Sequence, residues 1–156
     1  MAGGKMSPEA QELARFVGFF YDRYMNAGRR FPPEVHPLRF VSEMAEKSPG
    51  QALSGLKMAV GDCIEMASRW NCTRVEELDE ALRSNGIITL SEIRRRYWRR
   101  FKAILERGKI RNEQEYYFVK AVSLDTSTPM AEASVLELLL EDFEARSVPR
   151  QARTSV

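Results

Sequence analysis

The sequence predicts an all-α protein, an irregular bundle of six to seven helices in a single domain. Apolar residues recur at steps of three and four along most of the chain, the period of one buried helix face. Typical helix start residues (Ser, Thr, Asn) and stop residues (Gly) bound the same segments. The length of 156 residues, with 44% hydrophobic and 29% charged residues, is that of an ordinary globular domain.

The first half of the chain should form four helices. Ser7 suits the N-cap of the first, and Pro8 suits its first turn, where the missing N–H is not needed. Thr73 and Glu76 form a capping box for the fourth, which Gly86 ends. We expect these helices over about 7–26, 37–46, 49–70 and 73–85, the third being the central helix.

Three more helices are expected in the second half. Thr89 with Glu92 opens a basic helix that Gly108 closes, and Asn112 with Glu115 opens the next after a short turn. Aromatic and β-branched residues over 115–124 would also suit a strand, but the capping pair and the absence of other strand segments favour helix. The last helix covers about 129–147. Within this scheme residues 1–6 are a flexible N-terminus, 7–147 the helical domain and 148–156 a disordered tail.

Positive charge is concentrated in residues 89–111. This segment holds nine Lys and Arg residues against two acids, so its net charge is +7 in a chain whose total is +2. On a helical wheel, Arg95, Arg99 and Lys102 lie opposite an apolar arc, whereas Arg94 and Arg100 fall inside that arc beside Trp98. Arginine-rich helices with interleaved aromatic residues neutralise phosphates and stack on bases.

The main prediction is therefore a non-catalytic cytoplasmic binding or regulatory module that engages an anionic partner, RNA or DNA backbone first. The proposed contacts are Arg94, Arg95, Arg99, Arg100, Lys102, Arg107, Lys109, Arg111 and Trp98. In the competing interpretation, Arg94 and Arg100 lie along the aromatic rings and pair with buried carboxylates of the acidic last helix, while the other arginines form a solvated face. An acidic protein or a membrane surface would also suit the charge. A helix-turn-helix DNA reader is disfavoured, because the second helix would begin with acids at 113 and 115.

A second candidate surface consists of three consecutive aromatic residues, Tyr116, Tyr117 and Phe118. Three neighbours on a helix cannot all face one core, so one of them should be exposed or should meet a partner. Exposed aromatic side chains are common anchors of protein interfaces. The alternative function is thus a protein-interaction module such as an adaptor, an inhibitor or an assembly subunit, unless the helix is buried on two sides.

The sequence offers no catalytic or cofactor site. His36 is the single histidine and stands in a proline-rich connector, and Cys63 and Cys72 are too far apart for a CxxC site, so no zinc ligand set is expected. No glycine pattern matches a phosphate-binding loop. No signal peptide or membrane span is expected, which together with the unpaired cysteines indicates a cytoplasmic protein. Nothing in the sequence sets the oligomeric state.

Overall fold

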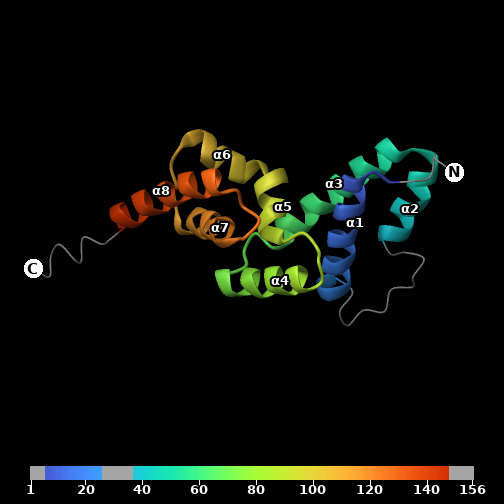
Figure 1. Cartoon of the computed structure of the whole chain (residues 1–156), viewed down its shortest axis with the longest axis horizontal. Helices are drawn as coiled ribbons and strands as arrows, with labels where there is room; N and C mark the ends of the chain where they lie inside the picture. Colours follow the sequence, from blue (N-terminus) through green and yellow to red (C-terminus); the bar gives the residue numbers. More distant parts are fainter. Residues whose placement is uncertain (1–5, 26–36, 148–156) are drawn as a thin grey trace, which may run out of the picture. The chain divides into compact units, whose positions relative to one another are not determined.

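The computed structural model describes residues 6–25 and 37–147 and is entirely helical in those ranges, with no strand. Eight α-helices and one π-helical turn follow one another along the chain (Figure 1). Their bounds are α1 Pro8–Phe20, η2 Tyr21–Met25, α2 Pro37–Lys47, α3 Pro49–Met66, α4 Cys72–Ser84, α5 Leu90–Tyr97, α6 Arg99–Arg107, α7 Glu113–Leu124 and α8 Met130–Ser147. The prediction of an all-α chain is confirmed, while the predicted number of helices is too low.

The chain divides into two compact units, and α4 contributes residues to each. The first unit comprises the chain up to residue 68 with residues 78–89, and the second comprises residues 69–77 with the chain from residue 90. The expectations for residues 1–5, for the connector that includes His36, and for the tail over 148–156 fall outside the described residues. The single domain over 7–147 stays a prediction.

In the first unit, α3 packs against both α1 and α2. Its buried side chains Leu56, Val60 and Ile64 recur at four-residue steps and meet the apolar face of α1. The Ser7 hydroxyl accepts a hydrogen bond from the amide of Ala10, so the predicted cap of α1 is confirmed. The central helix predicted to reach Trp70 ends at Met66, with Ala67 as its C-cap.

The start of α4 differs from the prediction. The side chain of Asn71, two residues before Thr73, accepts a hydrogen bond of 2.8 Å from the amide of Arg74. Asn and Thr are both N-cap residues, and Asn is the stronger of the two. Asn71 therefore begins the helix two residues earlier than the Thr73–Glu76 pattern indicates.

In the second unit, α7 packs against α5, α6 and α8 (Figure 1). Its buried residues Phe118, Val119 and Val122 form the centre of this unit's apolar core. Asn112 caps the helix, because its side chain accepts a hydrogen bond from the Glu115 amide. The predicted cap is confirmed, and residues 115–124 are helix rather than strand.

The predicted single basic helix is two helices, α5 and α6, separated by Trp98. The backbone of Trp98 is extended, with φ −92° and ψ 117°. This break buries the indole, whose centroid lies 4.4 Å from that of Phe118 in an edge-to-face arrangement. Burial of so large a side chain outweighs the local helix propensity of the segment. Because of this break, the described residues form eight α-helices where seven were predicted.

Candidate functional site

Arg94 lies in the core of the second unit. Its side chain is 1% exposed, and its guanidinium carbon stands 5.1 Å from the ring centroids of both Trp98 and Phe118. A side chain buried to this degree is out of reach of a phosphate. Its assignment to the anion-binding surface is therefore corrected: Arg94 is a structural residue that packs between aromatic rings.

Trp98 is also buried, so it offers no free face for stacking on a base. The guanidinium carbon of Arg100 lies 5.5 Å from its ring centroid and 5.2 Å from that of Phe118. Arg100 is exposed, and its Nη2 donates a hydrogen bond to Gln114. The two anomalous arginines of the helical wheel thus differ: Arg94 is internal, while Arg100 covers the aromatic pair from outside and keeps its charge at the surface.

Arg95 and Arg96 are paired with carboxylates. Both donate to the buried Glu92, at distances of 2.7 and 2.8 Å, and Arg95 also donates to Glu132 of α8. The hydrogen bonding of Arg95 to Glu92 is the main reason that the pKa of Arg95 is raised above its ordinary value. The competing interpretation assigns contacts with acids of the last helix to Arg94 and Arg100, whereas this contact is made by Arg95.

Glu115 organises the cations at the turn between α6 and α7. Its carboxylate accepts hydrogen bonds from Arg107 Nη2 at 2.5 Å, from the Arg111 amide at 2.8 Å and from the Arg111 side chain at 3.3 Å. Gly108 ends α6 in the left-handed conformation with φ 71°, and its amide donates to Ile104. One buried carboxylate therefore holds two guanidinium groups, which leaves an excess of one positive charge.

The remaining cations of this region are exposed. Within the described part of the chain, Arg99, Lys102 and Lys109 have no ion-pair partner. We define the α6 cationic surface as the exposed basic residues on α6 and the turn after it: Arg99, Arg100, Arg107, Lys109 and Arg111. Lys102 lies on another side of α6, where it lines a groove.

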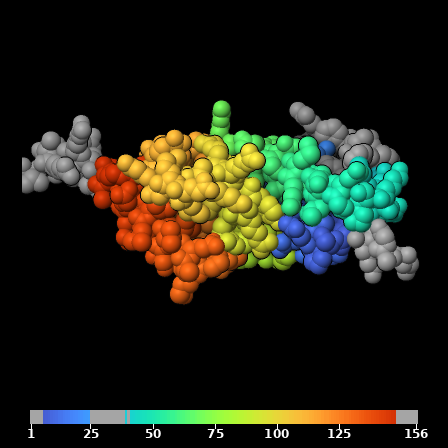
Figure 2. Space-filling model, turned by 90° about the horizontal axis from the view of Figure 1, so that it is seen from above, coloured from blue at the N-terminus to red at the C-terminus, as the bar shows by residue number. Residues whose placement is uncertain are grey.

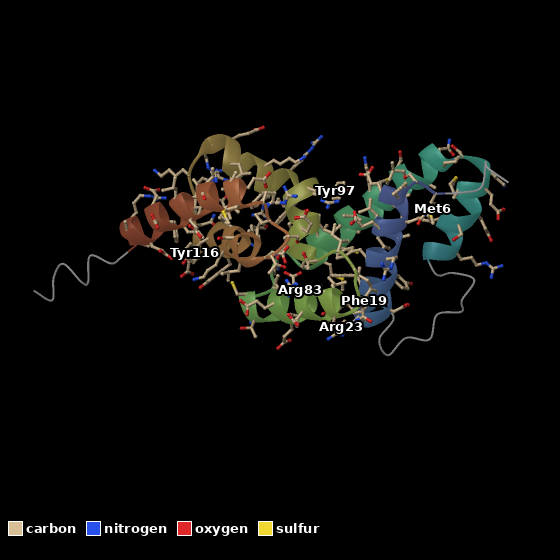
Figure 3. All side chains as sticks on the ribbon, viewed as in Figure 1. Met6, Phe19, Arg23, Arg83, Tyr97 and Tyr116 are labelled. Atoms are coloured by element: carbon tan, nitrogen blue, oxygen red, sulfur yellow. The ribbon has the colours of Figure 1, made fainter. Side chains whose placement is uncertain are left out.

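The three aromatic residues of α7 have three different environments. Phe118 is buried against Trp98. Tyr116, which is labelled in Figure 3, packs on Phe143 of α8 and donates a hydrogen bond to Glu144 of the same helix. That hydrogen bond is the main reason that the pKa of Tyr116 is raised. Tyr117 is 43% exposed. A hollow of about 290 Å³ is lined by Glu113, Tyr116, Tyr117, Phe143, Glu144 and Ser147. The predicted protein-partner face is thus reduced to Tyr117 and the edge of Tyr116.

A groove between α6 and α8 was missed by the sequence reasoning. It has a volume of about 500 Å³ and is lined mainly by apolar side chains: Arg95, Phe101, Lys102, Leu105, Ala131, Glu132, Val135 and Leu136. The two helices lie side by side on the face shown in Figure 2. A signal was present, because Ala131 and Val135 stand four residues apart on a side of α8 away from most of the predicted core face.

Neither cysteine has the features of a catalytic nucleophile. Burial, assisted by the charge of Asp62, raises the pKa of the Cys63 thiol to about 12. Burial also raises the pKa of Cys72. Both thiols are therefore protonated near neutral pH, and the thiolate is the reactive form. Across the described ranges, no group of three or more His, Cys, Asp or Glu side chains is arranged to hold a metal ion.

None of the described helices combines the length and the apolar character that crossing a bilayer requires. Comparisons of the chain with protein-family models, curated proteins and solved structures gave no match.

Proposed function

We propose that the protein is a small non-catalytic binding module that engages the phosphate backbone of RNA or DNA through the α6 cationic surface. The observation that carries the proposal is the excess of exposed positive charge there. Five exposed Lys and Arg residues form this surface, and residues 99–115 contain only three acids. The one buried acid among the three, Glu115, is shared by two arginines.

The geometry of the turn also supports phosphate as the ligand. Glu115 holds Arg107 and Arg111 by one or two donors each, and a guanidinium has five N–H donors in a planar fork. The N–H donors that Glu115 does not use lie on two neighbouring guanidinium groups that Glu115 holds in place. Such an arrangement suits the paired oxygens of a phosphate. Because the contacts would be to the backbone, binding should show little dependence on base sequence.

A titration of labelled single-stranded RNA and duplex DNA, followed by fluorescence anisotropy at several salt concentrations, tests the proposal. The association constant should fall as a power of salt concentration, with a slope of about 0.9 for each duplex phosphate neutralised. Arg99→Glu should weaken binding to both nucleic acids and lower the slope by about one. Lys57→Glu, the same charge change at an exposed position of α3, is the matched control and should leave binding unchanged. Absence of binding at low salt would refute the proposal.

The second candidate function, a protein-interaction module, is favoured by exposed Tyr117, which lines the hollow between the start of α7 and the end of α8. Aromatic anchors at shallow hollows are typical interface features. This function predicts association with a protein that tolerates salt and is lost in Tyr117→Ala. The nucleic-acid function predicts that Tyr117→Ala binds RNA as the wild type does, so one pair of variants separates the two.

A further inference from the structure

Three aromatic rings belong to the region of the α6 cationic surface, and all three are buried. Trp98 is 5% exposed, Phe118 is 2% exposed and Phe101 is 1% exposed. The guanidinium carbon of the exposed Arg100 stands over two of them, 5.5 Å from the ring centroid of Trp98 and 5.2 Å from that of Phe118. An unpaired base would have to displace core packing before it could stack on any of these rings. They therefore provide no stacking platform beside the charge.

Single strands and duplexes make different demands on a binding surface. Proteins that hold single strands without sequence preference combine cations with aromatic rings on which successive bases stack. In a duplex the bases already stack on one another. Its two strands together place one negative charge at about every 1.7 Å of helix axis, twice the density of either strand within it. A surface that supplies charge but buries its rings gains more from the duplex.

Two of the cations are also held at fixed places. Arg100 and Arg107 stand seven residues apart on α6, about 10 Å along the helix axis. Arg100 donates a hydrogen bond to Gln114 and Arg107 to Glu115, both in the first turn of α7, the helix that packs against α6 (Figure 1). Positioned cations suit a stiff ligand, because a duplex with a persistence length of about 150 base pairs presents its phosphates already ordered. A flexible single strand has to be ordered on binding.

We infer that the α6 cationic surface binds duplex nucleic acid in preference to single strands. The inference rests on the proposed function and narrows its ligand to the paired form. The chemistry that the surface recognises is the array of phosphates on a double helix, which duplex DNA and duplex RNA share. Contacts to phosphates carry no sequence information directly, so the preference follows the strandedness of the ligand rather than its base sequence.

Fluorescence anisotropy of the full chain tests the preference with three probes of equal length: a labelled DNA strand of mixed sequence, the same strand annealed to its complement, and an RNA duplex. With the five cations of the surface in contact, the salt slopes of duplex and single-stranded DNA should differ by about one. The two DNA affinities should meet when extrapolated to about 1 M salt, and the duplex should bind roughly tenfold more tightly at about 0.1 M. The RNA duplex should likewise bind more tightly than the single strand.

Two variants separate charge from stacking. Arg99→Lys keeps the positive charge but removes the planar guanidinium, which can stack on a base. Tyr97→Leu removes a half-buried ring that precedes the surface in the chain. Each variant should keep the wild-type ratio of duplex to single-strand affinity, and circular dichroism checks that each is folded. A loss of affinity confined to the single strand, in either variant, would show that bases stack at this surface and would overturn the inference.

Failure of this inference and failure of the proposed function give different results. If the single strand binds as tightly as the duplexes at about 0.1 M salt, the preference for paired strands is wrong, while the proposed function stands. If only one of the two duplexes binds more tightly than the single strand, the shared phosphate array is not what the surface recognises, and the inference is again overturned. If none of the three probes binds at low salt, both the inference and the proposed function are refuted.

Discussion

Arg107 donates a hydrogen bond of 2.5 Å from Nη2 to Oε1 of Glu115, across the turn that joins α6 to α7. The carboxylate is buried, while the arginine is partly exposed. The same oxygen accepts from the amide of Arg111, so one acid both pairs with a side chain and fixes the backbone of the turn. The position of the α6 cationic surface relative to α7 thus depends on a single negative charge.

Replacement of this acid should destabilise the protein. Glu115→Ala removes the shared acceptor of a guanidinium and a backbone amide, and we expect a loss of about 2 kcal/mol in the free energy of unfolding. Glu113→Ala, two residues earlier in the same turn and exposed, should cost about 0.5 kcal/mol or less through the helix dipole. Chemical denaturation of both variants measures the difference. Equal losses would contradict the organising role of Glu115.

Replacement of Gly108 and of Gly55 by alanine should change the stability of the protein in opposite directions. A Cβ atom added at Gly108 or at Gly55 would meet nothing within 4 Å, so only the backbone decides the effect. Gly108 has φ 71°, a conformation strained for alanine, and Gly108→Ala should cost about 1 kcal/mol. Gly55 lies inside α3, where Gly55→Ala should stabilise by roughly 0.5 to 1 kcal/mol. Thermal denaturation of the pair checks both signs, and a stabilising Gly108→Ala would show that α6 does not end as described.

The Cys63 thiol should make stability depend on alkaline pH. The thiol keeps its proton up to about pH 12 in the folded protein, against an ordinary pKa of 9.0 when unfolded. The stabilisation is therefore complete below pH 9 and is lost as pH rises from 9 toward 12. The expected loss from this group is about 1.4 kcal/mol per pH unit in that window.

Comparison of Cys63→Ala and Cys72→Ala with the wild type separates the effect of this thiol on stability from that of lysines and tyrosines, which ionise in the same pH range. Cys63→Ala should have a flatter decline in unfolding free energy between pH 8 and pH 10.5 than the wild type. Cys72→Ala should keep the steeper decline, because it retains Cys63. Identical slopes for wild type and Cys63→Ala would mean that the thiol is not protected from ionisation.

Helix ends that depend on neighbouring residues could be predicted from the sequence. Ser7 and Asn112 cap the helices that their local patterns indicated, since a cap is a contact across three residues. Asn71 replaced Thr73 as the N-cap because two capable residues lie within one turn and Asn is the stronger of the two, although only Thr73 has a glutamate three residues later.

Features set by tertiary packing could not be predicted in this way. The break at Trp98 arises because Phe118, twenty residues later, provides a ring to pack against. Arg94 and Arg100 have the same chemistry and lie near the same rings, yet one is buried and one is exposed. The groove between α6 and α8 likewise depends on which side of α8 the core uses, a choice made by the whole unit.

The break at Trp98 has a consequence for work with fragments. It leaves α6 only nine residues long, below the length at which an isolated helix persists in water. A synthetic peptide of this segment would carry the full charge but would lose the spacing that Glu115 and the aromatic pair impose. Such a mimic would report polyelectrolyte attraction alone, so binding assays require the folded chain.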